Sequence, residues 1–138
     1  MRMLTVHLHV VGALLMALGL SHNFFNRYFG WDVELAAVSL LTRRVFFVHT
    51  FFVAMTVTMM GAFTVAYARL LVEPQPQSRA IVAGMAVFWG SRLTAQFCAY
   101  DSAIWRGDRF RTRMHVAFSI FWIYVTTTYG LALVWSWR

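Results

Sequence analysis

The sequence predicts an all-α fold, a four-helix bundle that spans a membrane as a single domain over residues 1–138. Composition is the first observation behind this prediction, because 60% of the residues are hydrophobic and only 12% are charged. A soluble domain of this length cannot bury so much apolar surface. The second observation is the pattern of apolar residues, which form four long stretches. A helix that crosses a bilayer needs about 20 apolar residues.

Short polar or charged segments separate the four predicted spans. An aromatic group around Trp31, typical of a membrane interface, follows the first span. Pro74 and Pro76 end the second span, because proline cannot continue a helix. A charged segment over residues 101–112 separates the last two spans, and two tryptophans anchor the C-terminal end. We expect the spans at about residues 4–25, 45–71, 79–100 and 113–137.

A short helix at the membrane surface is expected after the first span, over residues 33–42. Asp32 can cap this helix, and Glu34 interrupts its apolar residues. Arg43 and Arg44 follow directly, and two arginines would not lie in the middle of a bilayer. The alternative is a helix that runs straight into the second span.

The basic residues suggest an orientation. The net charge is +7, and all twelve basic residues are arginines that punctuate the apolar runs, so we expect no nucleic-acid partner. Near the span ends, seven arginines lie on the side of the first and third loops, against four on the side of the termini. The positive-inside rule then places the first and third loops in the cytoplasm and the termini outside. We expect a bacterial inner-membrane protein whose partners are lipids and other membrane subunits or further copies of the chain.

The third span carries an arginine well inside its apolar stretch. Residues three or four positions apart share a helix face, so Arg92 is expected on one stripe with Trp89, Gln96 and Tyr100. A charge inside a bilayer is costly unless it faces protein, water or a counter-charge. No carboxylate lies inside any predicted span. The partner of Arg92 is therefore a ligand or one of three loop residues, namely Asp32, Asp101 and Asp108.

The most polar residues of the four spans are expected at similar depth in the cytoplasmic leaflet. The first span ends there and the second begins there, and the same holds for the third and fourth. The residues that this places together are His22, Asn23, His49, Arg92, Gln96 and His115.

Two histidines at equal depth on facing helices are the ligands that a b-type haem requires. His49 and His115 would bind the iron, which is the only metal that we expect, and nearby arginines would bind the propionates. A quinone is the alternative cofactor, because donor side chains in an aromatic slot can bind its carbonyl oxygens. Each histidine can instead be structural and bond a neighbouring span. The expected cofactor-binding residues are His22, His49, Trp89, Arg92, Gln96, Tyr100 and His115.

An anionic lipid head group is a further candidate ligand. Arginine binds phosphate through paired, charge-assisted hydrogen bonds. If a histidine then acted as a general acid or base, the chain would be a lipid-modifying enzyme. The alternative is that these arginines simply flank the spans. The residues expected to bind the head group are Arg43, Arg44, Arg92 and Arg113.

The leading functional hypothesis is a small membrane subunit of a redox or energy-converting complex that functions in electron transport. Its polar cluster would bind haem b, a quinone or a partner protein. The second hypothesis is a membrane protein that binds or modifies a lipid head group, and the third is a purely structural scaffold subunit. The sequence lacks a tandem carboxylate, a glycine-rich phosphate loop and a nucleophilic serine elbow, so it leaves open whether the chain is an enzyme.

Overall fold

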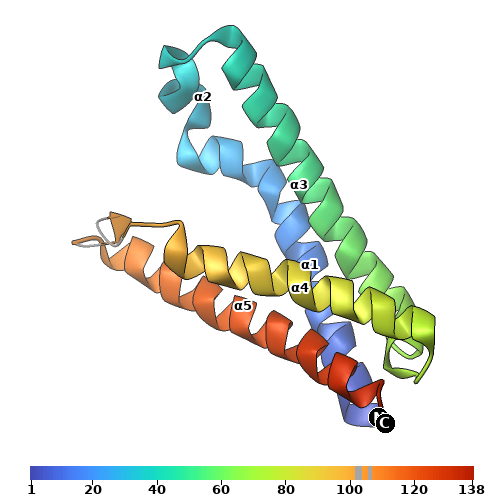
Figure 1. Ribbon diagram of the computed structural model, residues 1–138. Coiled ribbons are helices and arrows are strands. Elements are labelled where there is room, and N and C mark those ends of the chain that lie inside the picture. The colour runs from blue at the N-terminus through green and yellow to red at the C-terminus, as the bar shows by residue number, and fades with distance from the viewer. Residues whose placement is uncertain (102–103, 106) are drawn as a thin grey trace. The chain divides into compact units, whose positions relative to one another are not determined.

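The structure is a computed structural model that describes residues 1–101, 104–105 and 107–138 (Figure 1). The described residues contain helices and no strands, which confirms the all-α prediction. They form five helices instead of the expected four, because a four-residue helix follows the first long one. The elements are α1 (Arg2–Phe29), α2 (Trp31–Glu34), the 3₁₀ turn η1 (Leu35–Ala37), α3 (Leu40–Tyr67), the 3₁₀ turn η2 (Leu70–Val72), α4 (Pro76–Cys98) and α5 (Arg109–Trp135).

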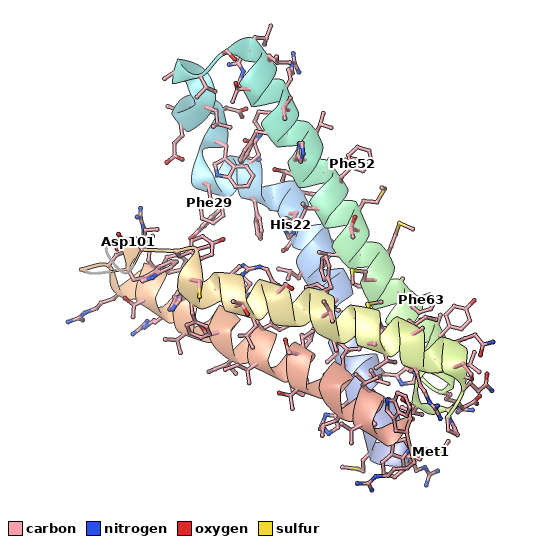
Figure 2. The ribbon with its side chains drawn as sticks, in the orientation of Figure 1. Met1, His22, Phe29, Phe52, Phe63 and Asp101 are labelled. Atoms are coloured by element: carbon pink, nitrogen blue, oxygen red, sulfur yellow. The ribbon has the colours of Figure 1, made fainter. Side chains whose placement is uncertain are left out.

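Three helices, α1, α3 and α5, are long and apolar enough to cross a membrane. Much of their apolar surface is exposed. The buried residues of α3 are Val57, Gly61 and Thr64, whereas Phe52 projects outward from this helix with 53% of its surface exposed (Figure 2). Helix α4 is not among the three, because its apolar stretch includes Arg92 and Gln96. The membrane span expected over residues 79–100 therefore stays a prediction.

The chain divides into two compact units, which we describe separately. The α1–α3 unit comprises His9–Ala66 and contains most of α1, together with α2, η1 and α3. The hairpin unit comprises Met1–Leu8 and Tyr67–Arg138 and contains the start of α1, together with η2, α4 and α5.

Glycines allow α1 and α3 to approach closely in the α1–α3 unit. A Cβ atom added to Gly61 would lie 2.6 Å from the carbonyl oxygen of Gly12 and 2.7 Å from the backbone nitrogen of Met16. Side chains larger than glycine would therefore separate the two backbones.

The surface helix expected over residues 33–42 is not continuous. Helix α2 ends at Glu34, η1 follows, and Val38 is extended (φ −92°, ψ 161°). Helix α3 then begins at Leu40, where the Ser39 hydroxyl accepts a hydrogen bond from the Thr42 backbone nitrogen at 3.2 Å. The two arginines that we expected to mark a boundary, Arg43 and Arg44, therefore lie inside the first turns of α3.

Helices α4 and α5 pack against each other as an antiparallel hairpin (Figure 1). At one end, the Arg79 Nε atom donates to the carbonyl oxygen of Ser136 at 2.8 Å, and the guanidinium carbon lies 4.6 Å from the ring centroid of Trp137. At the other end, the Asp108 carboxylate caps α5 by accepting from the backbone nitrogens of Phe110 at 2.8 Å and Arg111 at 3.0 Å. The contacts of Arg79 join the start of α4 to the residues that follow α5, whereas the Asp108 cap lies within α5 and sets where that helix begins.

The start of α1 packs within the hairpin unit. His7 Nδ1 lies 2.8 Å from the hydroxyl oxygen of Tyr124, which is in the middle of α5. Leu8 is fully buried. The core along the hairpin consists of Val82, Trp89, Trp122, Val125, Tyr129 and Ala132.

Candidate functional site

A chain of hydrogen bonds crosses from α4 to α5. Arg92 Nη1 donates to Gln96 Oε1 at 3.1 Å, and Gln96 Nε2 lies 2.9 Å from His115 Nδ1. Only 4% of the Gln96 surface is exposed, and Arg92 and His115 are half-buried. We call Arg92, Gln96 and His115 the polar relay. The hairpin thus brings together three of the residues that the sequence singled out.

The direction of the relay follows from the chemistry of its first member. A guanidinium group can only donate hydrogen bonds, so Arg92 requires the amide oxygen of Gln96 to face it. The amide nitrogen of Gln96 therefore faces His115 and donates to its Nδ1 atom. A ring nitrogen that accepts carries no hydrogen, so the neutral imidazole holds its hydrogen on Nε2. The relay ends in an N–H donor.

Aromatic rings surround both ends of the relay. The imidazole of His115 stacks on Trp105, with ring centroids 4.4 Å apart and an interplanar angle of 28°. The guanidinium carbon of Arg92 lies 4.7 Å from the ring centroid of Trp122. Trp122 stacks on Trp89 at 5.3 Å with an angle of 13°. Both indoles are buried, and the face of an indole attracts a cation.

The structure shows how Arg92 is held without a carboxylate. Within the described residues, the ion pair that forms is Arg111–Asp108 at 3.3 Å, and Arg92 forms none. Asp108 is thus committed to Arg111 and to the start of α5. Asp32 belongs to the α1–α3 unit and accepts a hydrogen bond from Asn26 at 3.2 Å. Asp101 is exposed at the turn between α4 and α5 (Figure 2).

Helix α4 does not extend to Tyr100. It ends at Cys98, with Ala99 as its C-cap, so Tyr100 does not continue the helical stripe expected from its spacing. Its ring instead lies 5.9 Å from that of Trp105.

Several expected site residues belong to the α1–α3 unit. His22 Nδ1 lies 2.8 Å from the carbonyl oxygen of Leu18, and His49 Nδ1 lies 3.0 Å from that of Val45, so both imidazoles bond their own helices. The remaining members of that set are Asn23, Arg43 and Arg44. The expected convergence of all four spans on one cluster therefore stays a prediction.

Trp105 and Trp122 are the contacts of the relay that the sequence did not single out as site residues. Trp122 lies on the same face of α5 as His115. The seven-residue spacing between the two, which is close to two helical turns, was the available signal. Trp105 comes from the loop, where no periodicity predicts which residue it contacts.

Binding of a haem by His49 and His115 stays a prediction, because the two histidines belong to separate units, but the hydrogen bonds of His115 favour another ligand. Iron is bound through a bare ring nitrogen while the other nitrogen donates its hydrogen to a neighbour. His115 has the opposite arrangement, because its Nδ1 accepts from Gln96. If the Gln96 amide were rotated, its oxygen would accept from His115 Nδ1 and Nε2 would be free for iron. The amide N–H groups would then face the N–H groups of Arg92, where no hydrogen bond can form.

A pocket of about 400 Å³ lies at the start of α5. Its lining combines two exposed arginines with a glycine, the capping aspartate and a threonine: Gly107, Asp108, Arg109, Thr112 and Arg113. The hydroxyl of Thr112 donates toward the carbonyl oxygens of Asp108 at 2.9 Å and Trp105 at 3.0 Å. The charge of the pocket is therefore set by the arginines and by a carboxylate that is already paired with Arg111.

No protein family, curated protein or solved structure gives a significant match to this chain.

Proposed function

We propose that this chain is a small integral membrane subunit of a redox or energy-converting complex and that it binds a quinone at the His115 end of the polar relay. The observation that carries the proposal is the direction of the relay, which fixes an N–H donor on His115 Nε2. Three helices with the length and composition of membrane spans support the location, because quinones are dissolved in the bilayer.

The chemistry of a quinone matches this donor. Each carbonyl oxygen of a quinone accepts hydrogen bonds, and its flat ring packs against aromatic side chains. Trp105 and Phe97 provide such rings beside His115, with centroids 4.4 and 6.1 Å from the imidazole. A quinol instead presents O–H groups, which face the His115 donor less favourably. The site should therefore bind the oxidised form more tightly than the reduced form.

Calorimetric titration of the protein in neutral-lipid nanodiscs with a short-chain ubiquinone analogue tests this proposal. The variant Gln96→Leu releases the imidazole from its fixed tautomer and should weaken binding about tenfold, equivalent to roughly 1.4 kcal/mol, the size of one hydrogen bond. Gln77→Leu is the matched control, because Gln77 is exposed on the same helix. Equal affinity of the wild type and both variants would contradict the proposal.

A second candidate function, binding of an anionic lipid head group, is favoured by the pocket at the start of α5. Arg109 and Arg113 are exposed there and form no ion pair within the described residues, whereas Arg111 is paired with Asp108. Clustered arginines beside an apolar helix attract anionic lipids at a membrane surface. A scaffold subunit would need neither this pocket nor the relay.

Native mass spectrometry of the protein released from membranes that contain phosphatidylglycerol tests this candidate. The double variant Arg109→Gln/Arg113→Gln should retain at least several-fold less anionic lipid, because each arginine near a membrane surface contributes about 1 kcal/mol of attraction. Arg27→Gln removes an exposed arginine at the end of α1 and serves as the control. If the double variant retains as much lipid as this control, the pocket is not a head-group site.

A further inference from the structure

Three buried polar atoms at the α4–α5 interface have no hydrogen-bond partner within the described residues. They are the indole nitrogens of Trp89 and Trp122 and the hydroxyl oxygen of Thr126. The residues are neighbours. The two indoles stack on each other, Thr126 lies one turn after Trp122 on α5, and its methyl group approaches Gly90, which follows Trp89. Buried polar groups in proteins are almost always hydrogen-bonded, so three unpaired groups in one place require an explanation.

Thr126 differs from most other threonines of the long helices. A threonine inside a helix commonly donates to the carbonyl oxygen four residues earlier. Seven threonines do so here at 2.7–3.2 Å, namely Thr5, Thr50, Thr58, Thr64, Thr94, Thr112 and Thr128. The Thr126 hydroxyl is buried and makes no such bond. Its O–H donor is therefore free for a group outside the helix.

The charge of Arg92 lies beside these atoms. Its guanidinium group covers the face of Trp122, whose N–H is one of the orphans, and it forms no ion pair within the described residues. The polar groups in this part of the interface are thus a cation, two N–H donors and a hydroxyl that can donate, beside the rings of Phe88, Phe118 and Phe121. Such a set excludes a metal cation and selects a species that accepts hydrogen bonds and carries negative charge.

We propose that α4 and α5 hold a small monovalent anion of the halide type beside Arg92, bound by the N–H groups of Trp89 and Trp122 and by the hydroxyl of Thr126. The anion would neutralise an arginine that has no carboxylate partner, and it would pair the three orphaned atoms. A water molecule would satisfy donors but would leave the charge of Arg92 uncompensated. The site does not depend on quinone binding, because the quinone would contact His115 at the other end of the relay.

Iodide titration of the tryptophan fluorescence tests the proposal with the whole chain in nanodiscs. The titration is made in sodium gluconate at constant ionic strength, because iodide quenches an indole that it touches. We expect a saturable component, which chloride displaces, on top of the linear collisional quenching of the exposed tryptophans. Strictly linear quenching that chloride does not change would overturn the proposal and would leave an ordered water as the partner of the orphaned atoms.

Two variants assign the saturable component to this site. Thr126→Val keeps the shape of the side chain but removes the hydroxyl, and it should raise the apparent dissociation constant of iodide about tenfold, the effect of one charge-assisted hydrogen bond. Thr128→Val is the matched control, because the Thr128 hydroxyl is already bonded to the carbonyl oxygen of Tyr124 at 2.8 Å. Equal constants for the two variants would place the iodide elsewhere. If either variant fails to fold, the wild-type titration still decides between saturable and linear quenching.

Discussion

Gln96 is the residue whose replacement tests the relay most directly. In Gln96→Leu, one N–H of Arg92 and the Nδ1 acceptor of His115 both lose their partner. A hydrogen bond to a charged group contributes about 1.5–3 kcal/mol and a neutral one about 0.5–1.5 kcal/mol. Arg92 is only half-buried and can recover part of the loss from water or lipid head groups, and leucine packs well in an apolar interior. We therefore expect a loss of about 2 kcal/mol in the free energy of unfolding.

Two measurements check this loss. Reversible unfolding in mixed micelles with increasing dodecyl sulfate, followed by circular dichroism, gives the free energy of unfolding, and Gln77→Leu should be close to wild type. Nitrogen NMR of the imidazole ring reports where its hydrogen lies. In the wild type, His115 should carry it on Nε2, and in Gln96→Leu the two neutral tautomers should mix. An unchanged tautomer together with unchanged stability would refute the direction that we assign to the relay.

The variant Gln96→Glu separates the two bonds of this residue. A carboxylate still accepts from Arg92, and it adds an ion pair, but it has no N–H to donate to His115. The stability should therefore stay close to wild type while the imidazole loses its fixed tautomer and takes a hydrogen on Nδ1. If Gln96→Glu kept the wild-type nitrogen spectrum, the result would contradict the hydrogen-bond directions that we infer from Arg92, whose guanidinium group can only donate.

Two further predictions concern the helices that carry the site. Asp108→Ala removes the cap of α5 and should lower the free energy of unfolding by about 1 kcal/mol, with faster hydrogen exchange at the Phe110 amide. Exchange as slow as in the wild type would argue against the cap. Gly61→Ala should lower the unfolding midpoint, because its Cβ would lie 2.6 Å from the Gly12 carbonyl oxygen. A Cβ atom added at Gly84 has no neighbouring atom within 4 Å, so Gly84→Ala should raise the unfolding midpoint slightly. If both variants shifted the midpoint in the same direction, the result would contradict the close packing of Gly61 against α1.

The sequence predicted the long helices better than their ends. Pro74 and Pro76 were expected to end the second span and the third span to begin at residue 79, whereas α4 begins at Pro76, because proline fits the first turn of a helix. The starts of the second and fourth were predicted too late, at residues 45 and 113, whereas α3 begins at Leu40 and α5 at Arg109. In both cases arginines were taken as boundaries. An arginine in the first turns can extend its side chain to the membrane surface, so charge alone does not end a helix.

The candidate site was predictable to the extent that it depends on spacing along one helix. The four-residue spacing between Arg92 and Gln96 predicts their contact, and the structure has that hydrogen bond. The expected depth in the membrane placed His115 near Arg92 and Gln96. The rotation of α5 about its own axis decides which aromatic ring covers Arg92, and this ring is Trp122. That rotation depends on the packing of the whole hairpin, so the contact with Trp122 could not be derived from the sequence.

Arg92 connects the two ligands that we propose, and it also separates them experimentally. Gln96 and the face of Trp122 orient its guanidinium group, but neither cancels its charge. The anion site depends on that charge, whereas the quinone site depends on the tautomer that Gln96 imposes on His115. Arg92→Met should therefore abolish saturable iodide quenching and weaken quinone binding only moderately, because Gln96 can still donate to His115. Gln96→Leu should weaken quinone binding and leave the iodide constant within about twofold, since Arg92 keeps its charge and its contact with Trp122. If both variants reduced both ligands in parallel, the interface would hold one ligand, and the anion and the quinone oxygen would be competitors for the same place.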